Sequence, residues 1–140
     1  MISYTSIKHP KIIQFPKMGN PTIGYISPAE NDNLPFVVKR IYWTYYTPEN
    51  VERGGHSHIN LEQILIAVSG IITVYTEMPG CLKASFVLDT PFFGLHLPKH
   101  CWRHMKYSHN AVQMCFASLE YDETDYIRNY EDFKLLRKSQ

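Results

Sequence analysis

Two histidines separated by one residue, His56 and His58, are the side chains of this sequence best suited to proton transfer. An unperturbed imidazole has a pKa of about 6.5, so it can accept and donate a proton near neutral pH. Alternate side chains of an extended strand point to one face. We therefore expect His56, His58, Asn60 and Glu62 to share a face and the two rings to face one cavity.

The residues around the pair favour an inward direction. Gly54 and Gly55 come directly before it, and adjacent glycines allow an unusual backbone path and a close approach of ligand to main chain. The following run ILIAV must be core, so the segment from His56 to Val68 is predicted to be one strand. The alternative, in which the histidines lie on a solvated edge, stays open from these residues alone.

The same segment also resembles a metal-binding motif. His-x-His-x-x-x-Glu followed later by Gly70 is typical of the first motif of the cupins, jelly-roll barrels that often bind a metal ion. A further histidine ligand usually stands five residues after a proline, and here Pro98 leads to Arg103. A guanidinium keeps its proton and cannot bind a metal, and His104 next to it would face the opposite side of a strand. We expect neither a metal nor another cofactor.

The elements that must position these residues are predicted to be strands. Short β-branched and aromatic runs alternate with turns that contain Gly, Pro or Asn. Their regular spacing indicates an all-β fold, a cupin-type jelly-roll barrel, whose further strands lie near residues 36–46, 71–77, 81–88, 92–97, 101–107 and 111–118. From about 122 to 138, aromatic residues near helical spacing, with acidic residues first and basic residues last, predict a C-terminal helix.

The bulk composition restricts the class of protein. With 140 residues, 44% of them hydrophobic, the chain is expected to form a single domain over 1–140. A formal net charge of +1 gives no reason to expect a nucleic-acid or membrane partner. Without a signal-peptide or membrane-spanning pattern we expect a cytoplasmic protein. Cys81, Cys101 and Cys115, an odd number without metal-type spacing, are expected to be reduced thiols.

From about Leu34 to Phe133 the sequence resembles the dTDP-4-keto-6-deoxyglucose 3,4-ketoisomerases. The stretches that carry the resemblance are RGGHSHINLEQ at 53–63, residues 94–102, and YDETDYIRNY at 121–130. The resemblance implies a metal-free cupin isomerase, and a homodimer that exchanges N-terminal strands. It also implies that the substrate is a dTDP-linked 4-keto sugar, and that the 3-keto product passes to a pyridoxal-phosphate aminotransferase on the way to 3-amino sugars.

The resemblance also implies roles for individual residues. The family's histidine pair falls on His56 and His58, and we expect His58, deeper along the strand, to be the base while His56 orients it or polarises a sugar oxygen. The arginines Arg40, Arg53 and Arg103 are expected to neutralise the diphosphate or the developing enolate. The expected substrate-binding set also includes Trp102, Tyr42 and Gln63, and Lys39 beside Arg40 is expected to face solvent.

The chain departs from the family pattern in two places. A common N-terminal Arg-Gly-x-Leu appears here as Ile23-Gly24-Tyr25-Ile26, so an arginine expected near the nucleotide is missing. The residue after the tryptophan, a histidine in some members, is Arg103, which favours a gluco product. Two alternatives remain: a nucleotide-sugar 3,5-epimerase-like cupin, with its histidine base acting at C3 and C5, and a non-catalytic sugar-binding cupin module.

Overall fold

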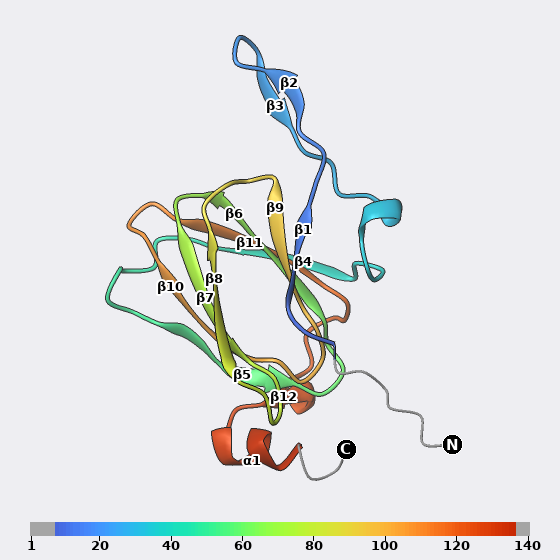
Figure 1. The fold of residues 1–140 in the computed structure, drawn as a ribbon, viewed down its shortest axis with the longest axis vertical. Coiled ribbons are helices and arrows are strands. Elements are labelled where there is room, and N and C mark those ends of the chain that lie inside the picture. Colours follow the sequence, from blue (N-terminus) through green and yellow to red (C-terminus); the bar gives the residue numbers. More distant parts are fainter. Residues whose placement is uncertain (1–7, 137–140) are drawn as a thin grey trace.

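The structure is a computed structural model that describes residues 8–136, and most of this chain folds into two antiparallel sheets (Figure 1). The first sheet contains, in spatial order, β1 (Lys11–Gln14), β9 (Phe93–Leu97), β6 (Gln63–Ser69), β11 (Val112–Ala117) and β4 (Arg40–Thr44). The second contains β12 (Tyr126–Ile127), β5 (Arg53–His58), β10 (Trp102–Tyr107), β7 (Ile72–Glu77) and β8 (Lys83–Leu88). The all-β prediction is confirmed.

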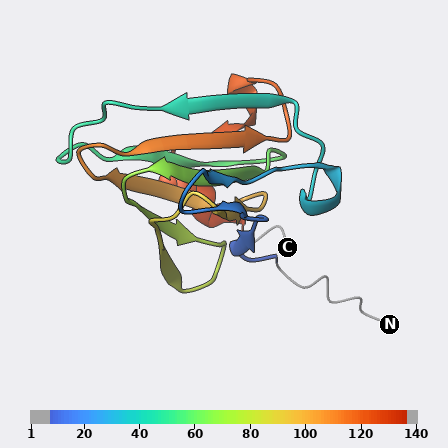
Figure 2. The same ribbon diagram turned by 90° about the horizontal axis from the view of Figure 1, so that it is seen from above.

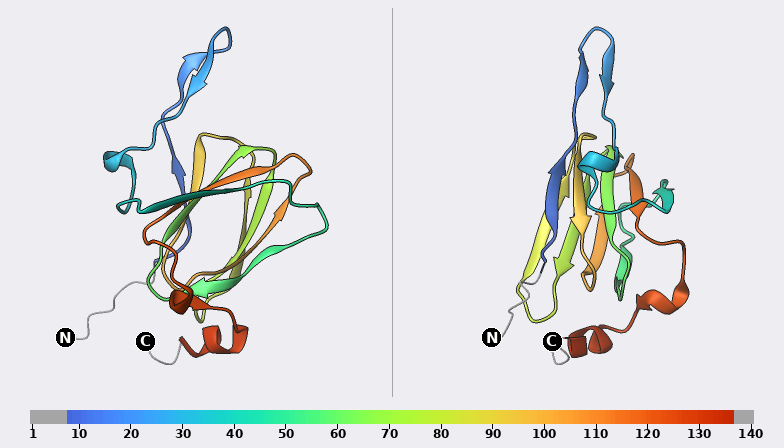
Figure 3. Two further views of the ribbon diagram at one scale, coloured as in Figure 1. Left: turned by 180° about the vertical axis from the view of Figure 1, so that it is seen from behind. Right: turned by 90° about the vertical axis from the view of Figure 1, so that its right-hand side faces the viewer.

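A separate hairpin, β2 (Met18–Asn20) with β3 (Gly24–Ile26), projects beyond the end of the two sheets (Figures 1 and 3). Three short helical elements complete the described part: η1 (Asn31–Asn33), η2 (Glu123–Asp125) and α1 (Tyr130–Leu135). Viewed from above, the edge strand β4 runs along one margin of the molecule (Figure 2). None of the helices in residues 8–136 has the length and apolar character that a membrane crossing requires.

The core lies between the two sheets and follows from the period-2 alternation of each strand. Along β7, for example, Ile72, Val74 and Thr76 are buried, whereas the residues between them are half exposed. Ile72 and Val74 form one apolar cluster with Leu65 and Ala67 of β6 in the other sheet. The five predicted strands from residue 71 to residue 118 therefore occur as β7 to β11. Cys81, Cys101 and Cys115 are free thiols, as expected.

The prediction of one strand from His56 to Val68 is wrong. β5 ends at His58, and β6 begins at Gln63 in the opposite sheet. The turn between them is held by the carboxylate of Asp125, which accepts the backbone N–H groups of Asn60 at 2.8 Å and Leu61 at 3.1 Å. These donors are therefore not available to a strand ladder, and the chain crosses from one sheet to the other.

Glu62 consequently does not share the face of the histidines as predicted. It lies after the crossing, where its Oε1 is 2.9 Å from Nε2 of His96 on β9. Its backbone N–H donates to the hydroxyl of Ser118 at 2.8 Å. The in-phase rule fails at this residue because it holds only within one uninterrupted strand.

The C-terminal helix is shorter than the predicted 122–138. Asn129 caps α1 at Tyr130, and the segment before it forms η2 and the two-residue strand β12. β12 pairs with β5, with Tyr126 opposite His58. Phe133 of α1 is buried and packs on Trp102, so the expected packing of this helix on the barrel is found. Positions 137 and 138 of the predicted helix lie outside the described residues.

Candidate active site

A cavity of about 360 Å³ lies where the edge strand β4 faces β5, β10 and β12 of the other sheet. Three arginines, Arg40, Arg53 and Arg128, line it. The remaining lining residues include His56, Tyr42 and Tyr126. With Tyr107, the cavity therefore combines an imidazole, three phenols and three permanent cations, a set suited to an anionic substrate that undergoes proton transfer.

The two glycines before the histidines shape β5. Gly54 and Gly55 have φ values of 94° and 73°, a region that L side chains rarely adopt. A Cβ on Gly54 would lie 2.9 Å from the carbonyl oxygen of Arg103 on β10. Arg103 pairs with His56 and the next β10 residue pairs with Gly54, so Gly55 is a bulge. Because a bulge shifts the side-chain alternation by one, both Arg53 and His56 line the cavity.

His56 and His58 lie on one face but differ in exposure. Their ring centroids are 4.9 Å apart with an angle of 84° between the planes, an edge-on contact. His56 is half-buried and lines the cavity, whereas His58 is fully buried. The ring of Tyr126, on the strand paired with β5, lies 4.3 Å from the His58 ring and 4.9 Å from the His56 ring. β12 therefore covers His58 and leaves His56 at the cavity wall.

Both imidazoles are neutral at pH 7. Burial, followed by the nearby positive charge of Arg103, lowers the pKa of His56 to about 3. The same two causes, in the same order, lower the pKa of His58 to about 2. A neutral imidazole carries a free lone pair, so it can act as a base without first losing a proton.

A buried chain of polar side chains runs from Arg103 to Tyr42. Arg103 is 1% exposed, and its Nε donates to the carbonyl of Cys101 at 3.0 Å. Its Nη1 donates to Oε1 of Gln63, and Gln63 Nε2 in turn donates to the Tyr42 hydroxyl at 2.8 Å. Burial raises the pKa of Tyr42 above its ordinary value. Gln63 therefore links a buried cation to a protonated phenol on the cavity wall.

The buried Nη2 of Arg103 and both ring nitrogens of His58 make no hydrogen bond within residues 8–136. The carboxylate of Asp125 lies near one of these groups: its Oδ2 is 3.4 Å from Nδ1 of His58. The aspartate is 6% exposed and also carries the two backbone bonds of the crossing turn. It was not among the residues predicted from the sequence.

The cavity residues Tyr126 and Arg128 were not predicted as site residues. Arg128 lies over the ring of Tyr126 at 4.2 Å and makes two hydrogen bonds to the carboxylate of Glu123, at 2.7 and 2.9 Å. Both belong to the stretch YDETDYIRNY, in which sequence reasoning saw only a helix. The signal available there was the resemblance itself, because the stretch is one of the three that carry it.

The structure does not bring Trp102 to the cavity. Its ring packs against Tyr130 at 5.2 Å and Phe133 at 5.5 Å, on the face of β10 opposite the buried side chain of Arg103. His104, as expected, also faces away from Arg103 and stacks on Tyr75 at 4.7 Å. The other predicted residues, Arg40, Arg53, Tyr42 and Gln63, lie at the cavity or one hydrogen bond behind its wall.

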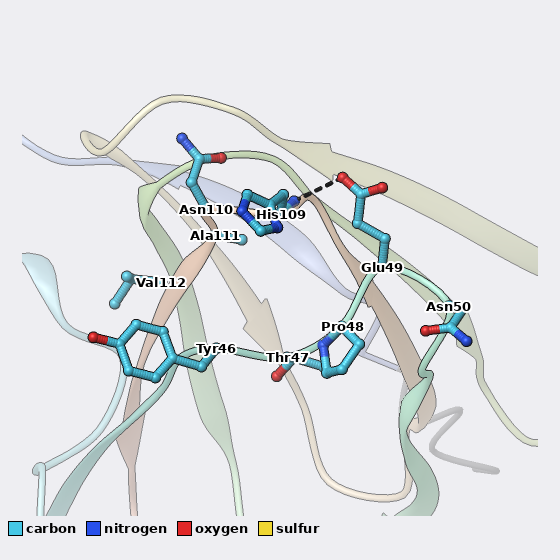
Figure 4. Close-up of a pocket in the computed structure, with 9 residues that line it drawn as sticks. All are labelled: Tyr46, Thr47, Pro48, Glu49, Asn50, His109, Asn110, Ala111 and Val112. Carbon is cyan, nitrogen blue, oxygen red and sulfur yellow. Dashed lines mark hydrogen bonds between the residues drawn. The ribbon is translucent and has the colours of Figure 1, made fainter.

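A larger hollow of about 920 Å³ lies between the loops 46–50 and 109–112 (Figure 4). The backbone N–H of His109 donates to the carboxylate of Glu49 across it. None of its nine drawn residues is an arginine or lysine, so it lacks the charge that a nucleotide diphosphate requires. We therefore assign the candidate active site to the smaller cavity. In residues 8–136, no three His, Cys, Asp or Glu side chains come together as metal ligands would.

Comparison with known proteins identifies the family. The family model FdtA (WxcM-like, C-terminal) matches residues 8–138. The TDP-4-oxo-6-deoxy-alpha-D-glucose-3,4-oxoisomerase of Aneurinibacillus thermoaerophilus is 38% identical over 125 residues, which are 89% of each chain.

Solved structures agree. A mutant of the 3,4-ketoisomerase QdtA from Thermoanaerobacterium thermosaccharolyticum, in complex with TDP-4-keto-6-deoxyglucose, has a TM-score of 0.89 at 30% identity, covering 96% of this chain and 98% of that one. The TDP-quinovose 3,4-ketoisomerase WlaRB from Campylobacter jejuni has a TM-score of 0.85 at 37% identity, covering 91% and 98%. This chain therefore belongs to the FdtA-like family of cupin-type sugar 3,4-ketoisomerases, and it is an isomerase.

Proposed function

We propose that this protein converts dTDP-4-keto-6-deoxy-D-glucose into a dTDP-3-keto-6-deoxyhexose, the ketone that an aminotransferase would convert into a 3-amino sugar. The observation that carries the proposal is the neutral ring of His56 on the wall of a cavity lined by Arg40, Arg53 and Arg128. The named activities of the relatives support the same substrate class.

The chemistry requires one base and one anion site. The C4 carbonyl acidifies the C3–H bond, and His56 takes this proton while negative charge moves onto the C4 oxygen. The resulting enediol accepts the proton back at C4 as the C3–O bond becomes a ketone, so C3 and its oxygen lose the two hydrogens that C4 and its oxygen gain. One imidazole beside both carbons can serve both steps.

The roles of the two histidines in this proposal are reversed from those expected in sequence. His56 is the base because its ring lines the cavity, whereas His58 is fully buried behind it. The Tyr42 hydroxyl, protonated and held by Gln63, is suited to hydrogen-bond a sugar oxygen. Arg103, whose charge acts on both imidazoles, is suited to stabilise the developing enediolate.

The three arginines at the cavity are proposed to bind the diphosphate. Guanidinium groups match phosphate oxygens in planar, two-point contacts. Two of the three, Arg53 and Arg128, are exposed, which suits an entrance. We propose a gluco product on the strength of Arg103 and of the 37% identity to a TDP-quinovose 3,4-ketoisomerase.

The experiment is incubation with dTDP-4-keto-6-deoxyglucose in deuterated water, followed by NMR of the sugar. The expected product has its ketone at C3 and carries deuterium at C4 to the extent that the proton on His56 exchanges with solvent before it is returned. In ordinary water the product keeps H4, and the H4–H5 coupling then distinguishes gluco from galacto. Deuterium at C5 without movement of the ketone would instead indicate an epimerase, and binding without exchange a non-catalytic module. Chelation is expected to leave the rate unchanged, which tests the absence of a metal requirement.

We also propose a homodimer. The outer face of the first sheet presents the exposed apolar side chains of Ile41 and Trp43 on β4. Trp43 is 59% exposed on the edge strand β4, and the hairpin β2–β3 beside this sheet pairs with no other described strand. A second copy would cover both the apolar face and the unpaired edge. A cytoplasmic location stays a prediction, to be tested by cell fractionation.

A further inference from the structure

Asp125 connects two parts of the molecule that the reaction needs in fixed positions. Its Oδ1 accepts the backbone N–H of Asn60 at 2.8 Å, and its Oδ2 accepts that of Leu61 at 3.1 Å. The same Oδ2 lies 3.4 Å from Nδ1 of His58. One carboxylate, 6% exposed, thus meets both the end of β5 and the turn that follows it.

A carboxylate oxygen only accepts hydrogen bonds, and this fixes what His58 can present to it. A neutral imidazole carries its proton on either Nδ1 or Nε2, and the partner of one nitrogen selects the form. Nδ1 faces Asp125, so the favoured form has the proton on Nδ1 and the lone pair on Nε2. The 3.4 Å contact is not aligned as a hydrogen bond, and such contacts often tighten once substrate is bound.

The ring of His58 in turn limits the ring of His56. The two rings meet edge-on at 4.9 Å, and Tyr126 packs against both. If His58 rotates, the edge against which His56 rests moves with it. We propose that Asp125 is a positioning residue for the isomerase: it holds His58 in the form protonated on Nδ1, and through His58 it fixes the ring of His56 at the cavity.

This inference rests on the proposed function, and it differs from a purely structural role. As a structural residue, Asp125 would only anchor the turn 59–62, and Ser118 anchors the same turn from the other side, through the N–H of Glu62 at 2.8 Å. Ser118→Ala therefore loosens the turn without touching either histidine. It is the matched control for Asp125→Asn, which keeps the size of the side chain but replaces one acceptor oxygen by a donor.

The experiment is ¹⁵N NMR of histidine-labelled protein with bound TDP, with the His58 signals assigned from the spectrum of His58→Gln. In the wild type, His58 is expected to be neutral with its proton on Nδ1. In Asp125→Asn the proton is expected to move wholly or partly to Nε2, while kcat falls roughly 10–100-fold, the scale seen when a partner that orients a metal-ligating histidine is removed. The Kd for TDP is expected to stay within about twofold, because Asp125 does not line the cavity.

Ser118→Ala is expected to leave both the His58 signals and kcat close to those of the wild type. A wild-type spectrum with the His58 proton on Nε2 would overturn the inference, even if Asp125→Asn does not fold. An equal loss of kcat in Ser118→Ala would also overturn it, because the turn alone would then explain the effect. A wild type that holds the Nδ1 proton but does not isomerise the sugar would refute the proposed function and leave the placement of the proton intact.

Discussion

The ring of His56 meets the ring of His58 edge-on, 4.9 Å away and at 84°, and only the first of the two lines the cavity. The pair is therefore not symmetric in what it can do. His56 lines the cavity, where we propose that it acts on the sugar, whereas His58 is fully buried behind it.

The activity is expected to be flat between pH 8 and pH 5 as far as His56 is concerned. Its pKa, lowered to about 3 by burial and by Arg103, keeps the base neutral throughout this range. The rate profile of kcat/KM measures this directly. A fall in kcat/KM with a midpoint near pH 6.5 would show an imidazole with its ordinary pKa. It would contradict the conclusion that burial and Arg103 lower the pKa of His56.

Stability, unlike activity, is expected to depend on pH in this range. Between pH 6.5 and about pH 3 the unfolded chain binds a proton at His56 that the folded chain does not, so the free energy of unfolding falls as the pH falls. Above pH 6.5 this contribution is fully present. Thermal melts of the wild type and of His56→Asn across pH 4–8 check it, and the variant is expected to lose less stability on acidification.

Gln63→Met is expected to destabilise the fold by about 1.5–3 kcal/mol, because it removes the acceptor of a buried guanidinium and the donor to Tyr42. The matched control is Gln113→Met, which removes a neutral bond from the Tyr107 hydroxyl and should cost only about 0.5–1.5 kcal/mol. Denaturant unfolding gives both values. Equal losses would mean that the hydrogen bonds of Gln63, including the one to the charged Arg103, stabilise the fold no more than the neutral bond of Gln113.

Arg53→Gln is expected to weaken TDP binding roughly tenfold, the equivalent of about 1.4 kcal/mol, with a smaller effect on kcat. Lys39→Gln removes the same charge from an exposed side chain that does not line the cavity, and it is expected to leave the Kd almost unchanged. Calorimetric titration with TDP measures both. A comparable weakening of TDP binding in the two variants would show that Arg53 acts only through the net charge of the protein and not through contact with the diphosphate.

Light scattering at micromolar concentration is expected to give about twice the 16.3 kDa of one chain. Trp43→Glu should shift the mass towards that of the monomer, because it buries a charge in the proposed interface. Val87→Glu, at a residue with the same 59% exposure on β8, serves as the control and should leave the dimer intact. A wild-type mass near 16 kDa would refute the dimer.

The sequence predicted the strands well because their signal is local. Alternation along β7 to β11 and the turns between them depend on neighbouring residues only. The same alternation shows that Trp102 and Arg103, adjacent on β10, cannot both face the cavity, yet both were expected at the substrate. Arg103 faces inward, and the tryptophan packs under α1.

The parts that could not be predicted depend on contacts between distant residues. The stretch around Asp125 has helical spacing, but its carboxylate accepts backbone hydrogen bonds from Leu61 and Asn60, 64 and 65 positions earlier. The α-helix begins only at Tyr130. The exposure of His58 likewise depends on Tyr126, which covers it from the far end of the chain. The sequence could identify the histidine pair but not which ring reaches the cavity.

The most direct test of the central claim is the loss of the C3 proton measured for the wild type, His56→Asn and His58→Asn with dTDP-4-keto-6-deoxyglucose in deuterated water. With His56 as the base, His56→Asn is expected to lose about 10²–10⁴-fold in exchange and isomerisation together, with TDP affinity preserved. His58→Asn is expected to lose less, because an amide can partly replace an orienting ring. A His56→Asn enzyme that exchanges C3 and forms the 3-ketone at nearly the wild-type rate would contradict the account.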